Sequence, residues 1–418
     1  MITTPDGCPV RHDFDPLEAG FTADPFTQLA ELRAESPVFY APAIKMWVVT
    51  RYRDVERILK DHERFSGANT QQPVFPLSEE AAAVMADGFG ATPTLSNGPE
   101  PRHGRVRAHC LKAFSARRLA VLAPTIRTRA AELIDAMLTR DRFEVVSSLT
   151  YPLPASVVFA LIGFPPQDAI RLKGLAAERM LFTWGRPTEA QQLDVARFMV
   201  DYWAYCEEFV ARRLDDPDDS FTGDLVRIHR EDPDALTPDE IVNVIHAISF
   251  AGHETTTNVA TSALLRLLHH RDQWEAICAH PELIPGAVEE ALRYDPSLFT
   301  WRRITTTAVD IDGVRLPAHT PLLLAIGSAN HDERKFPGPD TFDIRRPGNQ
   351  QHLTFGKGGH YCFGAPLARM ELGALLELLS ARAPSLRLAP GQDIAFHTNV
   401  VFHGPRELVL EWDGPVTA

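Results

Sequence analysis

The chain has 418 residues, 44% of them hydrophobic, and carries 42 Lys and Arg against 55 Asp and Glu, a formal net charge of −13. This length allows a large hydrophobic core. The acidic balance argues against a protein whose whole surface binds nucleic acid, although it leaves room for a local basic patch.

The cysteines and the N-terminus indicate a reducing compartment. The five cysteines are odd in number and include no Cys-x-x-Cys pair, so a disulfide framework is not expected. The N-terminus has no apolar signal core, and no stretch of the chain approaches the ~18 apolar residues of a membrane span. We therefore expect a cytoplasmic protein that does not enter a membrane.

The chain is expected to form one domain. Length alone suggests two or three, but its 33 prolines and 25 glycines are spread between apolar segments, without a linker, a repeat or a low-complexity tract. We predict an N-terminal tail at residues 1–19 and a single domain at residues 20–418.

The first hundred residues predict a mixed segment followed by a loop. Residues 20–66 read as a helix, a strand pair around Val38–Val49 and a second helix at Arg53–Asp61. Residues 67–100, rich in Pro, Gly, Ser and Asn apart from an alanine-rich insert at 81–86, read as a long mobile loop. Loops of this length are uncommon unless they have a task such as covering a ligand.

The remainder is mostly helical. From Val106 to Cys278 amphipathic helices follow one another, broken at Pro152–Pro154, at Pro165–Pro166 and at the acidic run Asp215–Asp219, which is expected to be a solvated loop. Strand-like pieces appear after Pro296, at 309–314, 322–326 and 407–412. The predicted class is mainly α with a smaller β portion (α+β).

A long helix with a weak middle is predicted from Thr237. Thr237-Pro238-Asp239-Glu240 is a capping box with proline at the first helical position, and the apolar pattern continues to about His269, a length of roughly 48 Å. Its middle, Ala251–Thr257, contains Gly and three Thr, which are unfavourable inside a helix. Either a core helix tolerates an irregularity here, or the break serves a site. A zinc-protease His-Glu-x-x-His motif is excluded, because position 257 is Thr.

The segment Phe355–Gly364 places one cysteine, Cys362, in a glycine-rich loop before an apolar helix that runs to Leu379. Glycines let backbone N–H groups approach the sulfur, and the positive end of the helix, with Pro366 in its first turn, favours a thiolate. One thiolate without a second cysteine nearby suits iron held by one axial sulfur, as in haem. A buried structural cysteine is the simpler alternative. A P-loop is excluded because Gly-Lys-Ser/Thr is missing, and a dinucleotide fingerprint because Tyr361 replaces its last glycine.

This segment resembles the haem-ligand signature of the cytochrome P450 family, Phe-Gly-x-Gly-x-His-x-Cys-x-Gly. The resemblance extends over about residues 20–413. The segments at 47–52, 183–187, 301–303 and 328–334 are similar to the haem domains of bacterial self-sufficient members fused to a phthalate-dioxygenase-type reductase. The resemblance implies the P450 fold around heme b (iron protoporphyrin IX), with Cys362 as axial ligand of the iron. The six matching positions are Phe355, Gly356, Gly358, His360, Cys362 and Gly364.

The same resemblance gives the helix break a role. Ala251, Gly252, Glu254 and Thr255 match the family's Ala-Gly-x-Asp/Glu-Thr, where the long helix crosses the oxygen-binding face of the haem. It implies that the Thr255 hydroxyl hydrogen-bonds dioxygen at the haem iron and that Glu254 helps to relay protons from solvent. Such a pair is chemically sensible, because cleavage of the O–O bond needs protons delivered to the distal oxygen.

Further positions match residues that hold the cofactor or its loop in the family. Glu290 and Arg293 match its Glu-x-x-Arg, and Arg346 fits the arginine that completes this buried network, which would keep the cysteine loop in shape. The haem propionates need cationic or hydrogen-bonding partners. By resemblance, four residues of this chain are the propionate partners. Arg303 is assigned to this role rather than the adjacent Arg302. The resemblance also implies that Phe355, Gly356 and Ala251 contact the cofactor. The four are His103, Arg107, Arg303 and His360.

The predicted substrate pocket is apolar, which favours a small hydrophobic or aromatic molecule. The resemblance implies a monooxygenase that activates dioxygen with electrons from NAD(P)H and hydroxylates or O-dealkylates its substrate. A hydrogen-peroxide-driven peroxygenase and a non-catalytic haem sensor remain as alternatives, although neither needs the Glu254-Thr255 pair. Besides the loop at 67–97, the pocket residues are Ala247, Phe250, Ala251, Leu298, Phe299 and Val400.

The electrons are expected from other proteins. The chain contains no flavin or iron–sulfur segment, so a ferredoxin and reductase, or a fused reductase absent from this chain, would supply them. Two basic clusters would be either ordinary solvated helix charge or the docking face for an acidic partner. They are Arg102, Arg105, Arg107, Lys112, Arg117 and Arg118, and Arg345, Arg346 and Lys357.

Overall fold

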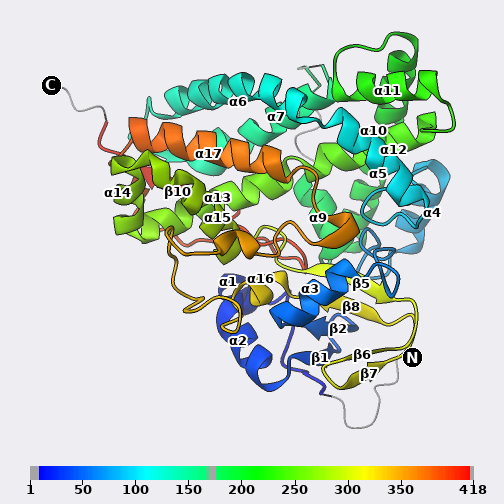
Figure 1. Cartoon of the computed structure of the whole chain (residues 1–418), viewed down its shortest axis with the longest axis horizontal. Helices are drawn as coiled ribbons and strands as arrows, with labels where there is room; N and C mark the ends of the chain where they lie inside the picture. Colours follow the sequence, from blue (N-terminus) through cyan, green and yellow to red (C-terminus); the bar gives the residue numbers. More distant parts are fainter. Residues whose placement is uncertain (1–8, 166, 169–175, 415–418) are drawn as a thin grey trace.

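The structure is a computed structural model and describes residues 9–165, 167–168 and 176–414. Helices fill most of the molecule, and most of the strands lie together at one end of it (Figure 1). The predicted class, mainly α with a smaller β portion, is confirmed. Among the described helices, none combines the length and the apolar character that crossing a membrane requires.

The N-terminal region forms the β-rich end, at the bottom of Figure 1. The helix, strand pair and second helix predicted for residues 20–66 are confirmed as α1 (Ala19–Ala23), α2 (Pro25–Glu35), β1 (Val38–Ala41), β2 (Met46–Val49) and α3 (Tyr52–Lys60). Part of the predicted tail also belongs to this region, because Phe14 and Leu17 are buried in its hydrophobic cluster.

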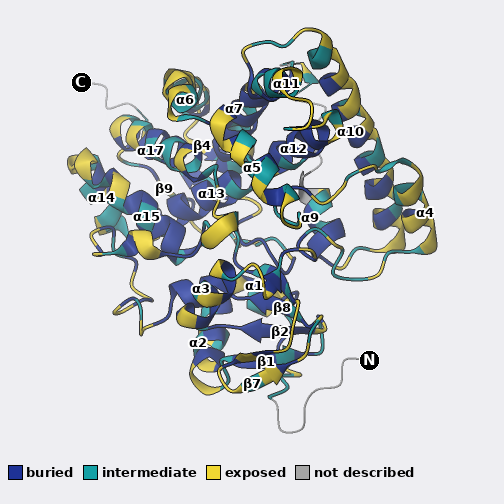
Figure 2. Cartoon of the chain, turned by 45° about the vertical axis from the view of Figure 1, so that its right-hand side comes forward, coloured by how far each residue is buried: buried dark blue, intermediate teal, exposed yellow. Residues whose placement is uncertain are grey.

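Five strands form the main sheet, in the order β1-β2-β8-β5-β3. Strand β2 runs antiparallel to β1, with Val38 opposite Val49, and parallel to β8, with Trp47 opposite Leu322. Both faces of β2 and β8 are almost fully buried, as Figure 2 shows. The remaining strands of the sheet are β3 (Phe65–Ser66), β5 (Trp301–Thr305) and β8 (Pro321–Leu324).

The strand predicted at 309–314 is a hairpin instead. Strands β6 (Val309–Ile311) and β7 (Val314–Leu316) pair antiparallel. Both turn residues, Asp312 and Gly313, have positive φ, 49° and 82°. This is the geometry that an Asp-Gly turn favours in a two-residue hairpin.

The prediction of a long loop at 67–100 is wrong for the middle of this segment, which forms the helix α4 (Glu79–Gly88). Ser78 caps this helix by accepting a hydrogen bond from the N–H of Ala81. Ala81 is fully buried against Val195 and Met199 of α10 (Glu189–Asp215), so the alanine-rich insert is a helix that packs closely on a second helix. Small side chains permit this close approach.

The other helices make up the body of the molecule, with α6 beside α17 and α10 beside α4 in Figure 1. Pro152 begins α7, and Gly163, with φ of 90°, ends it. The acidic run at 215–219 connects α10 to α11. The helices are α5 (Arg102–Ala113), α6 (Ala116–Met137), α7 (Pro152–Ile162), α9 (Ala176–Trp184), α11 (Phe221–Glu231), α12 (Pro238–Ala251), α13 (Glu254–His269), α14 (Arg271–Ala279), α15 (Ile284–Tyr294), α16 (Ile326–Asn330) and α17 (Ala365–Arg382).

Short elements complete the fold. A second sheet joins β4 (Arg142–Glu144), β10 (Val409–Glu411) and β9 (Arg387–Leu388), which confirms the predicted C-terminal strand. The shorter helical turns are η1 (Val146–Thr150), η3 (Pro281–Leu283), η4 (Asn349–Gln351) and η5 (Gly358–His360).

The long helix predicted from Thr237 is two helices, α12 and α13, separated by Gly252 and His253. Its capping box is confirmed, because Thr237 and Glu240 each bond the other's backbone N–H. The break coincides with a close approach of α7, since a Cβ on Gly252 would lie 2.5 Å from a methyl carbon of Val158. Both helices run through the buried centre of the molecule (Figure 2).

Candidate active site

A cavity of about 580 Å³ lies where α9, α12 and α13, the 68–97 segment and the cysteine loop meet. The 68–97 segment is fastened over it, because the Trp184 indole N–H donates to the Thr70 carbonyl (3.1 Å) and the Thr92 N–H donates to Asn243 Oδ1 (2.8 Å). Most predicted site residues line this cavity: Arg107, Ala247, Phe250, Ala251, Thr255, Leu298, Arg303, Phe355, Gly356, His360 and Cys362.

The backbone of the cysteine loop depends on its glycines. Gly356 and Gly358 both have φ of +71°, whereas Gly359 does not adopt this left-handed conformation. A Cβ on Gly358 would also lie 2.9 Å from the Cα of Lys60 on α3. Larger residues at position 358 would therefore be strained and would push the loop away from α3.

Cys362 opens onto the cavity at the start of α17. Its N–H donates to the Phe355 carbonyl (2.9 Å), which closes the loop. Burial by the surrounding protein raises the pKa of the Cys362 thiol, while the N–H groups of Gly364 and Ala365 and the charge of Arg107 lower it. The helix end and the arginine thus favour the thiolate, as the sequence predicts, but in the protein alone burial outweighs them.

Three cationic or basic side chains lie along the cavity wall near this loop. Arg303 is buried, and its only side-chain hydrogen bond among the described residues goes to the Arg302 carbonyl (2.8 Å). Burial lowers the pKa of Arg303 to about 10. Arg107 donates to the Tyr361 carbonyl. Burial, then His103 and the two arginines, lowers the pKa of His360 to about 3.

His103 lies behind this group. It is buried and stacks on the His360 ring, with centroids 3.9 Å apart, while its Nδ1 lies 2.8 Å from Glu100 Oε1. It does not line the cavity. The structure therefore places Arg107, Arg303 and His360 for contact with an anionic ligand in the cavity, and places His103 as support for His360.

At the helix break, the two residues of the predicted catalytic pair lie in different surroundings. Thr255 lines the cavity, and its hydroxyl donates to the Ala251 carbonyl (2.9 Å). Glu254 is buried behind the wall, 3.5 Å from His253 Nε2. Burial raises the pKa of Glu254 to about 7.

His253 is oriented toward Glu254. Its Nδ1 lies 2.6 Å from the Ser249 carbonyl, so Nδ1 carries the proton and Nε2 is an acceptor in the neutral ring. Burial lowers the pKa of His253 to about 4, which keeps the ring neutral. His253 Nε2 is therefore the acceptor side of the ring, and Glu254, with its pKa near neutrality, is the neighbouring group that can hold a proton.

The predicted network of Glu290, Arg293 and Arg346 is formed and buried. Glu290 Oε1 accepts from Arg293 Nη2 (2.8 Å), Arg346 Nε (3.1 Å) and the Asp343 N–H (3.0 Å). The arginines donate otherwise to carbonyls of the 330–341 segment, not to the cysteine loop. That the trio keeps the cysteine loop in shape remains a prediction, because within the described residues it makes no direct hydrogen bond to that loop. The link runs through Asn330, whose Oδ1 accepts from the Leu353 N–H (2.8 Å).

A second network, which sequence reasoning missed, does touch the loop. Arg369 pairs with Glu289, and its guanidinium carbon lies 4.6 Å from the ring centroid of Phe355. His352 Nε2 lies 3.3 Å from the other oxygen of Glu289. Burial alone would raise the pKa of Glu289, but hydrogen bonds from His352 and Arg369 bring it to about 2. The Glu-x-x-Arg spacing marks Glu290 but not Glu289, so no motif in the sequence pointed to the second network.

Two predicted pocket residues lie outside the cavity wall, which corrects that prediction. Phe299 is buried between Phe26 and Gly327, where a Cβ would lie 2.1 Å from its ring. Val400 is buried, and its N–H donates to the Trp184 carbonyl (2.9 Å). Both belong to the hydrophobic cluster that supports the wall.

Three ionisable residues that sequence reasoning missed also line the cavity: Arg179, His246 and Glu371. Glu371 is buried on α17, its Oε2 has no hydrogen-bond partner among the described residues, and burial raises its pKa well above the ordinary value. Its position in an otherwise apolar helical run was the available signal. Arg179 stands near the start of a helix with no motif to mark it.

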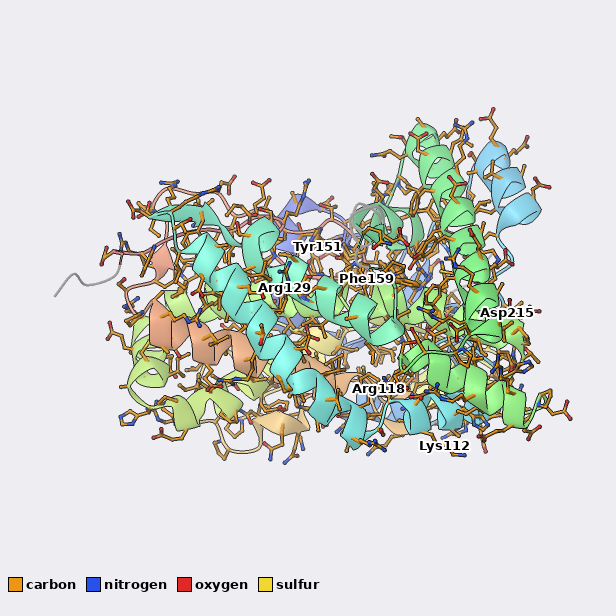
Figure 3. All side chains as sticks on the ribbon, turned by 90° about the horizontal axis from the view of Figure 1, so that it is seen from above. Lys112, Arg118, Arg129, Tyr151, Phe159 and Asp215 are labelled. Carbon is orange, nitrogen blue, oxygen red and sulfur yellow. The ribbon has the colours of Figure 1, made fainter. Side chains whose placement is uncertain are left out.

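Four of the nine residues in the predicted basic clusters form ion pairs. Arg102 and Arg105 pair with Glu240, Arg118 with Asp224, and Arg346 with Glu290. Figure 3 shows Lys112 and Arg118 where α5 meets α6. Within the described part of the chain, five members have no ion pair: Arg107, Lys112, Arg117, Arg345 and Lys357.

The residues around the cavity fit a haem. A single cysteine thiol with supporting N–H groups opens onto it, and a Cβ on Gly364 would lie 3.6 Å from that sulfur. Arg303 is a buried cation without a carboxylate partner among the described residues, which is costly unless an anion joins it. A haem propionate is such an anion, and the sulfur is the axial ligand that the iron needs.

Comparisons with known proteins agree with this geometry. A family model described as Cytochrome P450 matches residues 179–381. The chain is 33% identical over 408 residues to the cytochrome P450 monooxygenase PikC of Streptomyces venezuelae, covering 96% of this chain and 94% of that protein.

Two solved structures are similar over nearly the whole chain. An intact type IV self-sufficient cytochrome P450 monooxygenase superposes with a TM-score of 0.94 at 38% identity, covering 99% of this chain but only 55% of its own. Cytochrome P450 CREJ, in complex with (4-ethylphenyl) dihydrogen phosphate, superposes with a TM-score of 0.93 at 37% identity, covering 96% of this chain and all of its own.

Proposed function

The chain belongs to the cytochrome P450 family and is a monooxygenase of that family, and on this premise we propose that it hydroxylates or O-dealkylates a small hydrophobic or aromatic molecule, with NAD(P)H as the electron source through redox partners. The observation that carries the proposal is that Cys362 and Thr255, far apart in the sequence, line one cavity. The resemblance to haem domains of self-sufficient members, read from the sequence, is confirmed by the solved type IV relative.

In the proposed holoenzyme, Cys362 would hold the haem iron through its sulfur, and Arg107, Arg303 and His360 would hold the propionates. Phe355, Gly356 and Ala251 would contact the ring from the cavity wall. When bound, the haem supplies an iron that activates dioxygen for insertion of one oxygen atom into the substrate. The buried and unpaired guanidinium of Arg303 supports this assignment.

The proton supply is assigned to the helix break. Thr255 is the group that touches the reacting oxygen, because its hydroxyl lines the cavity. Glu254, with a pKa near neutrality, loads and releases a proton behind the wall, and His253 Nε2 is the acceptor that it faces. A group with a pKa near the working pH exchanges protons readily in both directions.

The electrons are assigned to separate proteins. We assign the docking of an acidic partner, a ferredoxin or a reductase module, to Lys112 and Arg117, two of the cluster members without an ion pair in the described part of the chain. They lie on and just after α5, which reaches the cysteine loop through the rings of Phe114 and Phe363, 5.6 Å apart between centroids. A cytoplasmic location remains a prediction.

The substrate class is supported by the wall residues Ala247, Phe250 and Leu298. The relative CREJ holds an alkylphenyl phosphate, which supports an aromatic substrate here as well.

Turnover of the purified holoprotein tests the proposal and its two alternatives. Reduction under carbon monoxide should give the red-shifted, thiolate-type spectrum. Small aromatic compounds should then be oxidised with NAD(P)H, a surrogate ferredoxin and its reductase. Product formed only with hydrogen peroxide would indicate a peroxygenase, and spectral shifts with substrate but no product under either condition would indicate a haem sensor.

A further inference from the structure

Arg179 is a charged residue in an otherwise apolar part of the cavity. It lies on α9 and lines the cavity with its guanidinium over the face of Phe250, 4.5 Å from the guanidinium carbon to the ring centroid. Its Nε is buried without a hydrogen-bond partner, and within the described residues no carboxylate pairs with it.

The groups nearest to Arg179 in electrostatic terms do not neutralise it. Burial lowers the pKa of Arg179 to about 10, whereas the neighbouring Tyr202 and Cys206 act to raise it. Both of these are uncharged near neutral pH, because burial raises the pKa of each. Arg179 is therefore a cation at neutral pH with no anion beside it.

His246 adds a second polar group at the same place. It lines the cavity from α12, and its Nε2 is buried without a partner among the described residues. Burial and the charge of Arg179 lower its pKa well below the ordinary value, so the ring is neutral. A neutral imidazole can donate one hydrogen bond to a ligand while adding no charge.

A cation without an anion in a largely apolar cavity is expensive, and the cation–π contact with Phe250 returns only part of that cost. We propose that the cavity selects substrates with an anionic oxygen group, such as an aryl phosphate or aryl carboxylate, which Arg179 binds as an ion pair and His246 as a hydrogen-bond donor. The inference rests on the proposed function, since it specifies the substrate of the same site.

The position of the two residues also orients the substrate. His246 lies five residues before Ala251 on α12, about 7.5 Å along the helix axis. Thr255 follows after the break. The anionic group would therefore be held at the end of the cavity away from Thr255, and the opposite end of the molecule would be presented for oxidation.

Calorimetric titration of the holoprotein with three matched ligands tests this inference: 4-ethylphenyl phosphate, 4-ethylbenzoate and the neutral 4-ethylanisole. At least one of the two anions should bind about tenfold or more tightly than the neutral compound. Arg179→Met should weaken that anion roughly 10- to 100-fold, as expected for loss of a charged hydrogen-bonded pair, and change the neutral ligand less than about twofold. Arg179→Lys should retain most of the preference.

Arg186→Met is the matched control. Arg186 also lies over a phenylalanine, 4.9 Å from the Phe75 centroid, but it pairs with Asp15 and does not line the cavity. This variant should bind all three ligands like the unmodified protein. If Arg179→Met does not fold, Arg179→Gln replaces it.

Equal affinity for the neutral ligand and both anions, or equal weakening of all three in Arg179→Met, would overturn the inference. The carbon monoxide spectrum of the same preparation tests the proposed function separately. A missing thiolate band with a retained preference for anions would count against the haem-thiolate assignment and not against the anion site.

Discussion

The cysteine-loop side of the cavity and the helix-break side treat buried polar groups in opposite ways. Around the cysteine loop, Glu289 and Glu290 each accept hydrogen bonds from arginine, and their networks are closed. At the break, His253 Nε2, Thr257 Oγ1 and both side-chain atoms of Asn258 are buried without partners among the described residues.

The difference distinguishes residues that hold the structure in place from residues that take part in the chemistry. A satisfied network specifies one geometry, because every donor already has its acceptor. An unsatisfied buried group costs free energy and so indicates a place where a ligand, a water molecule or a proton is handled. Glu371 is an exception on the cysteine-loop side, since it lies on α17 and lines the cavity, yet its Oε2 has no partner among the described residues.

The largest expected effect is the loss of the haem thiolate and of turnover. Cys362→Ser should abolish the thiolate-type carbon monoxide spectrum and reduce turnover below detection, because serine does not supply the thiolate. Cys278→Ser, at a half-buried position on α14, should leave both unchanged. Retention of the thiolate spectrum by Cys362→Ser would show that another residue holds the iron.

Breaking the closed network should cost stability. Arg293→Met leaves Glu290 buried with only part of its charge balanced, and we expect the free energy of unfolding to fall by about 3–5 kcal/mol in urea titrations. The control is Arg129→Met in the exposed pair with Glu132, also three residues apart on a helix (Figure 3), where less than about 0.5 kcal/mol is expected. Similar losses in both variants would remove the distinction between the two kinds of pair.

The helix-break side should make the free energy of unfolding depend on pH. The pKa of Glu254 is raised from 4.5 to about 7, so between these values the folded protein holds more protons than the unfolded chain. Its contribution to the free energy of unfolding therefore falls as the pH rises from 4.5 to 7, by about 3 kcal/mol in total.

Glu254→Gln cannot ionise and should lose this component of the pH dependence, becoming more stable than the unmodified protein above pH 7. Urea titrations from pH 4.5 to 8 measure it. Glu275→Gln, at an exposed position on α14, should keep the original pH profile. Identical slopes in Glu254→Gln and the unmodified protein would mean that Glu254 is not protonated in the folded state.

The smallest effect is expected at Thr255. Thr255→Ala removes a hydroxyl whose only hydrogen bond in the described structure goes to the Ala251 carbonyl, so stability should change little. Product formed per NAD(P)H consumed should fall roughly 10- to 100-fold, at the lower end of the usual contribution of proton transfer. Thr255→Ser should restore most of it. Unchanged coupling in Thr255→Ala would exclude the threonine from oxygen chemistry.

Much of the site was predictable because it is encoded locally. The glycine-rich cysteine loop, the capping box at Thr237 and the weak segment at 251–257 each combine residues within ten positions of one another. The predictions that failed concern residues whose position depends on contacts with distant parts of the chain. Nothing near residues 81–86 in the sequence reveals that α10 covers them, and the wall positions of Phe299 and Val400 depend on packing against α9 and the N-terminal region.

By itself, the sequence determined the family, the mainly α class and the positions of the cysteine, the helix break and the Glu-x-x-Arg network. Only the tertiary structure decided which buried charges are paired. Arg293 is enclosed by the carboxylate of its Glu-x-x-Arg motif, whereas Arg179 and Arg303 line the cavity without an anion among the described residues. The physical reason is that backbone geometry follows from neighbouring residues, whereas the balance of a buried charge depends on groups that folding brings from distant parts of the chain.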